Sequence, residues 1–128
     1  MKRHIAWLSI LVLSLSVHFA YFGHPNQTVF DEVHFGKFVA GYFTHEYFFD
    51  IHPPLGKLII SSAAYLADFK PGFSFGTIGD AFPDSTYQAM RLLPTLAGTL
   101  LPLVIFFLCL RLGMSKKGAW LAAIFIAL

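Results

Sequence analysis

Two adjacent carboxylates, Asp31 and Glu32, follow a long apolar run near the start of the chain. A carboxylate within hydrogen-bond reach of a hydroxyl group can act as a general base. Carboxylates in the first turn of a helix are also stabilised by the helix macrodipole. Thr28 stands three residues before Asp31, which is the spacing of a capping box with Thr28 as the N-cap. The local pattern therefore leaves two interpretations open: the two acids stabilise the start of a helix, or they are catalytic residues of an enzyme.

A metal site is a further interpretation of the same region, because several of its side chains can bind a metal ion. Their spacing matches neither HExxH nor a paired-cysteine motif, so we predict no metal. His18, inside the first apolar run, is expected to be a buried helix-contact residue. The candidate ligands are Asp31, His34, His45, Glu46, Asp50 and His52.

The composition indicates a membrane protein. The 128 residues are 56% hydrophobic and only 12% charged, whereas soluble domains carry about 25% charged residues. The mean hydropathy is +0.64. A net charge of +2 is too small to indicate a nucleic-acid partner, and the single cysteine, Cys109, excludes an internal disulfide framework.

Three apolar runs predict the spanning helices of an all-α, multi-pass membrane protein. We expect a first transmembrane helix within residues 1–23, a second over 92–110 and the start of a third over 118–128. Prolines inside the second run are tolerated, because neighbouring helices satisfy the freed backbone carbonyls. Lys2 and Arg3 also fit the start of a secretory signal peptide, but no clear small-x-small cleavage site follows, which favours a retained helix.

The distribution of charge predicts the orientation. Basic residues precede the first apolar run and occur in residues 111–117, directly after the second run, so both places are expected on the cytoplasmic side. Residues 24–91 then form an external or luminal loop, and this loop holds all seven acidic residues. Apolar residues at helical spacing predict two amphipathic helices in it, over about 31–48 and 54–69. Such helices usually lie in the plane of the membrane interface.

Arg91 opposes the positive-inside bias, because it stands at the external end of the second apolar run. Arginines at this depth commonly extend to reach water. We nevertheless expect a partner for it, either a nearby carboxylate or the phosphate of a lipid headgroup, which a guanidinium binds through two parallel hydrogen bonds. Lys57, on the polar side of the second amphipathic helix, could serve the same phosphate more loosely.

Three stretches of the loop resemble the protein O-mannosyltransferases, a polytopic family that uses a polyprenyl-phosphate mannose donor. The stretches are FDEVHFGKF at 30–38, FFDIHPPLGK at 48–57 and IGDAFPDSTYQAMR at 78–91. The resemblance runs from about residue 25 to the end of the chain. It implies the GT-C fold, in which a large first external loop carries the catalytic acid. It also implies that the chain is an N-terminal fragment of a longer enzyme and inactive by itself.

The same resemblance implies roles for individual residues. Asp31 matches the catalytic aspartate of the family, and Glu32 matches the neighbouring acid that assists sugar or acceptor binding. Arg91 matches an arginine needed for activity. His52 and Lys57 fall within the HPPLGK signature and are expected to bind substrate or its phosphate, with their individual roles open. No cofactor is expected apart from the lipid-linked donor.

The implied reaction is the inverting transfer of mannose from a polyprenyl (dolichyl) phosphate to Ser or Thr hydroxyls of proteins. The expected partners are the lipid bilayer, the donor, acceptor proteins and a homologous dimer partner. The short start before the first helix favours a bacterial inner membrane, with the endoplasmic reticulum membrane as the eukaryotic alternative. Two other functions stay open: a GT-C enzyme for another lipid-linked sugar, and a non-catalytic membrane subunit whose loop binds a partner.

Overall fold

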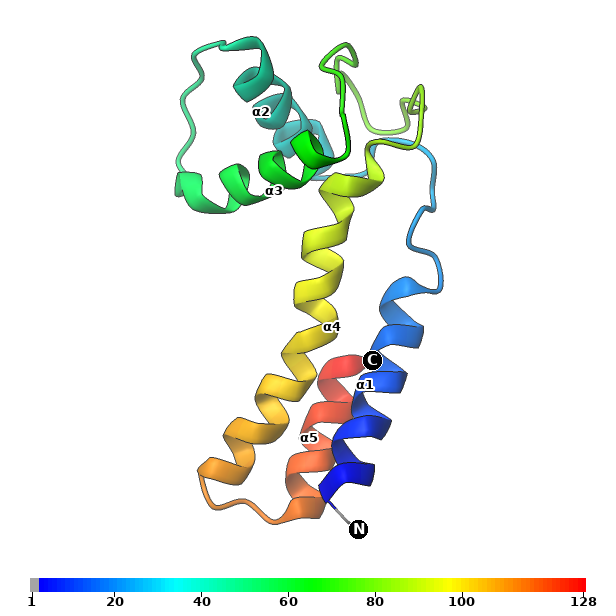
Figure 1. Ribbon diagram of the computed structural model, residues 1–128, viewed down its shortest axis with the longest axis vertical. Helices are drawn as coiled ribbons and strands as arrows, with labels where there is room; N and C mark the ends of the chain where they lie inside the picture. The colour runs from blue at the N-terminus through cyan, green and yellow to red at the C-terminus, as the bar shows by residue number, and fades with distance from the viewer. Residues whose placement is uncertain (1–2) are drawn as a thin grey trace. The chain divides into compact units, whose positions relative to one another are not determined.

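The computed structural model describes residues 3–128, so Lys2 lies outside the described residues. The described residues form five helices and no β-strand (Figure 1), apart from an isolated antiparallel bridge between Gln27 and Ala81. The helices are α1 (Arg3–Phe19), α2 (Glu32–Thr44), α3 (Pro54–Leu66), α4 (Gln88–Arg111) and α5 (Lys116–Ala127). The all-helical prediction is confirmed for this part of the chain.

The helices divide into two compact units. The first, here called the apolar unit, contains the residues up to Phe22 together with Pro94–Leu128. The second, here called the loop unit, is Gly23–Leu93. The first turns of α4 therefore belong to the loop unit, and the rest of α4 belongs to the apolar unit.

The apolar unit is held together by close approach of its helices. Its buried cluster combines small and large side chains, and small residues let helix backbones come close. Ser14 Oγ of α1 donates a hydrogen bond of 2.9 Å to the carbonyl oxygen of Thr99 in α4. His18 is half-buried against Gly98, where an added Cβ would lie 2.8 Å from the His18 ring. The buried cluster consists of Ala6, Ile10, Phe106, Ala119 and Ala123.

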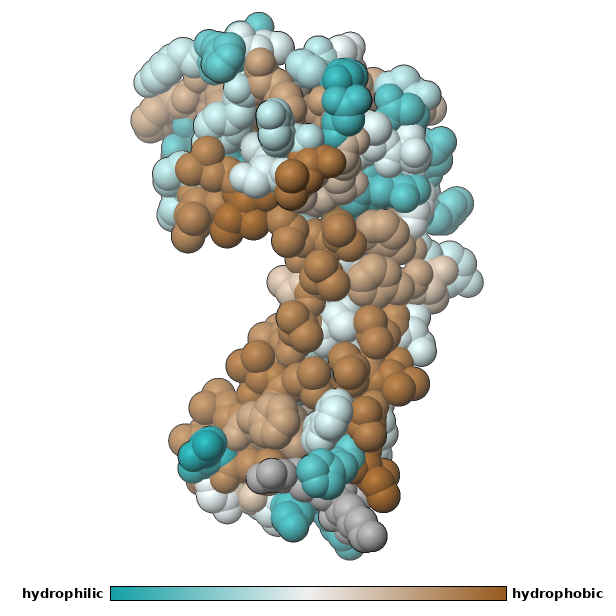
Figure 2. All heavy atoms as spheres, viewed as in Figure 1, coloured by the Kyte–Doolittle hydropathy of each residue, from teal (hydrophilic) through white to brown (hydrophobic). Residues whose placement is uncertain are grey.

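One helix among residues 3–128, α4, is both long enough and apolar enough to cross a membrane, with 24 residues. α1 is apolar but has 17 residues, and α5 has 12. Figure 2 shows that hydrophobic side chains cover much of the visible surface of this unit. Of the three expected spanning elements, the structure thus shows one of full spanning length.

The loop unit is built around α2 and α3, which pack against each other over an aromatic core. The Phe75 ring lies directly on Gly36 of α2, where an added Cβ would come within 2.2 Å of it. α2 ends at Thr44, earlier than the sequence pattern indicated, because His45 adopts a left-handed conformation with φ 58°. α3 begins at Pro54 and ends at Leu66. The core residues are Val39, Ala64, Phe69, Phe75, Phe82 and Tyr87.

The outer face of α3 is apolar although it is exposed. In Figure 2 a hydrophobic patch covers this helix within an otherwise largely hydrophilic unit. The buried residues of α3 are instead Lys57, Ser61 and Ala64. The exposed apolar residues of this helix include Leu55, Leu58, Ile59 and Leu66.

Candidate functional site

Glu32 and Arg91 form a two-point ion pair across the loop unit. Arg91 Nη2 donates to Glu32 Oε2 at 2.8 Å, and Arg91 Nε donates to Glu32 Oε1. The Glu32 side chain retains 22% of its accessible surface, and the Arg91 side chain retains 13%. Parallel N–H···O bonds of this kind fix the orientation of both groups. Of the two partners expected for Arg91, the structure shows a carboxylate, and that carboxylate is Glu32.

Arg91 has further bonds that hold the start of the loop unit. Nη1 donates to the carbonyl oxygen of Pro25 at 2.8 Å, and Nη2 donates to that of Gln27 at 3.0 Å. The guanidinium also lies over the Tyr87 ring, 4.7 Å from its centroid. A cation over an aromatic face is attracted by the ring quadrupole. Arg91 therefore joins α4 to the segment that leads into α2.

Asp31, beside Glu32 in sequence, has a very different environment. It is the residue that precedes α2, and its side chain makes no capping hydrogen bond. It is exposed, and no ion pair within the described residues includes it. Ionised carboxylates only accept hydrogen bonds. The structure thus presents one tethered carboxylate, Glu32, beside one exposed carboxylate, Asp31.

The predicted capping box at Thr28 is wrong. Thr28 is fully buried, and its hydroxyl donates to the carbonyl oxygen of Asp80 at 3.3 Å. Its backbone N–H also donates to that oxygen, at 2.8 Å. Thr28 therefore bonds to Asp80, 52 residues further along the chain, and does not cap α2. Glu32 instead reaches back three residues and accepts the backbone N–H of Val29 at 2.9 Å.

The helical pattern placed Lys57 on a solvated polar face, and this prediction is wrong. Its side chain is 3% exposed, and Nζ donates to Asp50 and, at 3.0 Å, to the carbonyl oxygen of His52. Nζ also lies 4.9 Å from the centre of the Phe38 ring. Burial of an ammonium group requires such partners, because removing an unpaired charge from water is very unfavourable. Lys57 anchors the segment before α3 from the inside.

The sequence pattern predicts no role for Asp50 except as a candidate metal ligand, yet Asp50 is the centre of this cluster. It accepts Lys57 Nζ and also faces His52 Nδ1 at 3.0 Å. The hydrogen bond from Lys57 lowers the pKa of the Asp50 carboxyl group to about 2, against the opposing effect of burial, and His52 contributes in the same direction as Lys57. The available sequence signal was the lysine itself, because a lysine in an apolar environment needs a nearby acid.

The predicted site residues therefore fall into two groups within the loop unit. Glu32 and Arg91 form one group, with Asp31 adjacent in sequence. His52 and Lys57 form the other, together with Asp50. The centre of the His52 ring lies 6.4 Å from the centre of the Phe35 ring of α2. Among residues 3–128, no three His, Cys, Asp or Glu side chains are gathered as a metal ion would require.

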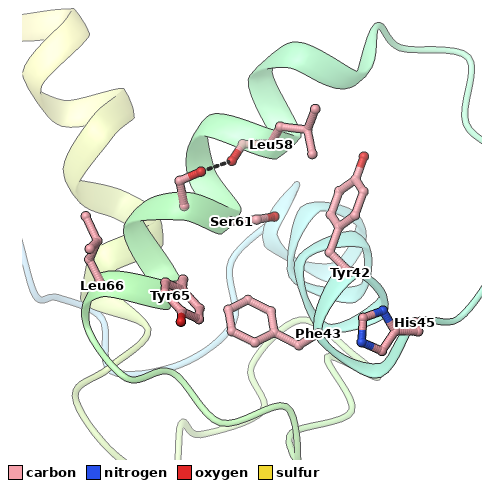
Figure 3. A pocket seen from close by; sticks show the side chains of 8 residues that line it. Tyr42, Phe43, His45, Leu58, Ser61, Tyr65 and Leu66 are labelled. Atoms are coloured by element: carbon pink, nitrogen blue, oxygen red, sulfur yellow. Dashed lines mark hydrogen bonds between the residues drawn. The ribbon is translucent and has the colours of Figure 1, made fainter.

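A separate pocket lies between α2 and α3 (Figure 3). It has a volume of about 500 Å³ and contains none of the predicted site residues. Phe43 and Tyr65 face each other across it, with ring centres 6.4 Å apart. Its lining is mainly aromatic and aliphatic, with hydroxyl groups from two α3 serines. The lining residues are Tyr42, Phe43, His45, Leu58, Ser61, Ser62, Tyr65 and Leu66.

Comparison with known proteins relates this arrangement to a family. The family model described as dolichyl-phosphate-mannose-protein mannosyltransferase matches residues 8–128. Dolichyl-phosphate-mannose–protein mannosyltransferase 4 of Schizosaccharomyces pombe is 40% identical over 114 residues, which are 88% of this chain and 15% of the relative. Protein O-mannosyl-transferase 2 of Danio rerio is 38% identical over 114 residues, 89% of this chain and 15% of that protein.

A solved structure agrees with these relatives. The chain is similar to the Saccharomyces cerevisiae protein O-mannosyltransferase Pmt1-Pmt2 complex bound to the sugar donor, with a TM-score of 0.92 and 33% identity. The match covers 99% of this chain and 18% of the solved chain. The present chain thus spans less than a fifth of the length of the proteins it matches. By its family match and by these identities, the chain belongs to the dolichyl-phosphate-mannose-protein mannosyltransferase family.

Proposed function

We propose that the chain is part of an enzyme that transfers mannose from a polyprenyl (dolichyl) phosphate to Ser or Thr hydroxyls of proteins. Membership of the mannosyltransferase family supports this proposal, as do the names of the relatives. The similar yeast structure is described as bound to a sugar donor. The observation that carries the proposal is the contrast between the two adjacent carboxylates of the loop unit, Asp31 and Glu32.

Asp31 is proposed as the general base. An exposed carboxylate without a capping bond can approach an acceptor hydroxyl, which a carboxylate committed to a cation cannot do as well. In the proposed step, Asp31 takes the proton of the Ser or Thr hydroxyl as its oxygen bonds to the anomeric carbon of mannose. The bond from that carbon to the phosphate oxygen breaks, and the lipid phosphate leaves. A single displacement inverts the anomeric centre.

Glu32 is proposed to orient the substrate, and Arg91 to hold Glu32. The ion pair fixes the Glu32 carboxylate, and the bond to the Val29 N–H holds the turn that carries both acids. Positioning of this kind contributes to catalysis, because reacting groups must meet within a narrow range of distance and angle. Phosphate is already a good leaving group, so charge neutralisation and positioning supply much of the remaining rate.

The membrane placement is also a proposal. α4 is long and apolar enough to span, and all seven acidic residues lie within residues 24–91. We propose that α1, α4 and α5 belong to a multi-pass membrane protein and that the loop unit lies on the external or luminal side. The exposed apolar face of α3 fits the membrane interface. The named relatives are eukaryotic and support an endoplasmic reticulum membrane; they give no support to the bacterial inner membrane favoured from sequence.

Activity of the full-length protein tests this proposal. The purified protein, incubated with dolichyl phosphate mannose and a Ser/Thr-containing peptide, should release mannosylated peptide. Transfer that is competed equally well by a lipid phosphate carrying another sugar would indicate a GT-C enzyme of different donor specificity. Absence of transfer from any lipid-linked sugar, with the protein folded, would instead indicate a non-catalytic subunit.

A further inference from the structure

A second pocket of the loop unit differs from the one in Figure 3 in the charge of its lining. It has a volume of about 510 Å³ and lies between α2, the segment that follows α2, and residues 71–74. Its lining includes one cation, Lys37, and one anion, Glu46. By contrast, none of the described residues that line the pocket between α2 and α3 is an Asp, Glu, Lys or Arg. The aromatic residues of the second pocket are Phe38, Tyr47, Phe48 and Phe73.

The walls of the second pocket are held by aromatic contacts. Phe48 lies over Gly41 of α2, where an added Cβ would come within 3.0 Å of the Phe48 ring. The ring centres of Phe48 and Phe38 are 4.9 Å apart. On the other side, the ring centre of Phe73 lies 4.9 Å from that of Phe75, which belongs to the core. Because both walls are anchored within the loop unit, the pocket is formed before any ligand binds, as ligand sites usually are.

Three side chains of the second pocket are available to a ligand. Lys37 and Glu46 are exposed, and no ion pair within residues 3–128 includes either of them. Tyr47 retains 92% of its accessible surface. Tyrosine is enriched among the residues that dominate binding at protein interfaces. The second pocket therefore combines an exposed tyrosine with two charges that the fold itself does not use.

One face of α2 connects this pocket with the proposed base. His34, Lys37, Gly41 and Thr44 follow Asp31 at intervals of three or four residues, which places them along one face of the helix. The side chains on this line are exposed, and Gly41 is covered by Phe48. The ten residues from Asp31 to Gly41 cover about 15 Å along the axis. An extended peptide spans that distance with about four or five residues.

The charges decide between the bilayer and a polypeptide as the occupant. Charged side chains are unfavourable in hydrocarbon, so Lys37 and Glu46 do not suit a lipid chain. A polypeptide carries backbone donors and acceptors, together with side chains of both signs, and can satisfy both groups. The acceptor of the proposed reaction is a polypeptide, and its hydroxyl must reach Asp31 at the start of the same helix.

We propose that the exposed face of α2 binds the acceptor polypeptide and that the second pocket receives a bulky apolar side chain of this acceptor, about four or five residues from the Ser or Thr that is mannosylated. Tyr47 and Phe48 contact that side chain, and Lys37 and Glu46 interact with charges beside it. This inference rests on the function proposed above, because it adds a sequence preference for the acceptor to the same reaction.

Peptides that differ only in the position of one phenylalanine test the proposal. Each peptide has a single threonine in a background of alanine and glycine, and the phenylalanine is moved stepwise along both sides of the threonine. With full-length wild-type protein and dolichyl phosphate mannose, KM for the peptide should be about tenfold lower when the phenylalanine is four or five residues away on one side, as expected for burial of much of its ring. A KM that does not depend on this position would overturn the proposal.

Two exposed aromatic residues, two positions apart, provide matched variants. Tyr47 lines the second pocket, whereas Phe49, which retains 80% of its accessible surface, is not among the described lining residues. Tyr47→Ala should remove most of the advantage of the best-placed phenylalanine, with kcat and the donor KM within twofold of wild type. Phe49→Ala should keep that advantage. Since both side chains are exposed, both variants should fold. Equal loss in the two variants, or no loss in Tyr47→Ala, would contradict the assignment to this pocket.

The roles of Lys37 and Glu46 are tested by placing a lysine or an aspartate beside the best-placed phenylalanine. In wild type the two charges offset each other, so the two peptides should differ in KM by less than twofold. Lys37→Ala should favour the lysine peptide and Glu46→Ala the aspartate peptide, each by about twofold to fivefold, the range of exposed charge pairs. The controls Asp68→Ala and Lys70→Ala, from an exposed ion pair elsewhere in the loop unit, should leave the ratio unchanged. An unchanged ratio in the Lys37 and Glu46 variants would contradict their contact with the acceptor.

Failure of this inference differs from failure of the proposed function. If the wild-type protein mannosylates all the peptides with the same KM, the proposed function holds and only the acceptor pocket fails. If the folded wild-type protein transfers mannose to none of them, the proposed function itself fails.

Discussion

Arg91 and Glu32 are 59 residues apart in sequence and are joined by two hydrogen bonds, one of them 2.8 Å from Nη2 to Oε2. This pair ties the first turn of α4 to the first residue of α2. It orders the turn that carries Asp31 without using the Asp31 carboxylate. A tethered acid and an exposed acid, adjacent in sequence, are the central feature of the loop unit.

Breaking this pair should impair the turn that carries both acids. Arg91→Ala removes the guanidinium from Glu32 and from two backbone carbonyl groups, at a cost of about 1–3 kcal/mol. Full-length Arg91→Ala should therefore lose at least tenfold in mannosyl transfer. Lys70→Ala, which removes an exposed lysine, should stay within twofold of wild type. Equal losses in the two variants would mean that Arg91 serves only as an interfacial cation.

The coupling between the two residues can be measured directly. Glu32→Gln and Arg91→Met, made singly and together, form a double-mutant cycle. Because each single change leaves a half-buried charge or amide without its partner, the double variant should be less destabilised than the sum of the two singles. Protection of the α2 amides against hydrogen exchange reports the difference. Additive effects would show that the ion pair carries no coupling energy.

Acid should loosen the segment before α3. The pKa of Asp50 is lowered from 3.8 to about 2, so the folded state favours its ionised form. At pH values above the pKa of the unfolded chain, a group whose pKa is lowered by folding stabilises the folded state. For Asp50 this stabilisation is lost as the pH falls from about 4 towards 2. Amide protection at the start of α3, corrected for intrinsic exchange, should decline over this window. Asp80 and Asp84 also have lowered pKa values, because threonine groups donate hydrogen bonds to them.

The Asp50/Lys57 double variant separates these contributions. Asp50→Leu with Lys57→Met should lose the acid-dependent decline at the start of α3. It should keep any decline near residues 77–86, where Asp80 and Asp84 bind Thr77 and Thr86. The same decline at α3 in this variant as in wild type would show that Asp50 is not its cause.

Two glycines of the loop unit should respond in opposite ways to alanine. At Gly36 an added Cβ would lie 2.2 Å from the fully buried Phe75 ring, and forcing such contacts costs about 1–3 kcal/mol. At Gly56, in α3, nothing lies within 4 Å, and alanine favours the helix by about 1 kcal/mol. Gly36→Ala should lower the amide protection of α2, whereas Gly56→Ala should leave that of α3 equal or higher. Equal effects would contradict the packing of Phe75 on Gly36.

Helices could be predicted from this sequence because their signals are local. The apolar spacing after Phe35 and the proline at position 54 both mark real helices, since periodicity and a proline at the helix start act within a few residues. The end of α2 was predicted too late. The left-handed conformation of His45 terminates it, and no glycine marks that position.

The errors at Thr28 and Lys57 share a physical cause. Thr28 has the spacing of an N-cap, but its hydroxyl is used by Asp80, which lies 52 residues further on. Lys57 has the charge of a surface residue, but Asp50 makes its burial tolerable. A single sequence shows the donors and acceptors without showing which of them fold together. For the same reason, a partner for Arg91 was predictable from its unusual location, whereas the choice of Glu32 was not.

The role of Asp31 is the claim on which the proposed mechanism depends. Asp31→Asn keeps the shape of the side chain but removes its ability to accept a proton, and the residue makes no capping bond that folding would lose. Loss of a general base typically lowers the rate by about 10²–10⁴-fold. The matched control is Asp68→Asn, whose carboxylate is exposed and distant in sequence from the two acids.

The most direct measurement is the rate of mannose transfer from dolichyl phosphate mannose to an acceptor peptide by full-length Asp31→Asn protein, at saturating donor and acceptor. If Asp31 is the general base, kcat should fall at least a hundredfold, with the protein still inserted in the membrane and the Asp68→Asn control near wild type. A kcat within threefold of wild type for Asp31→Asn would show that Asp31 is not the base.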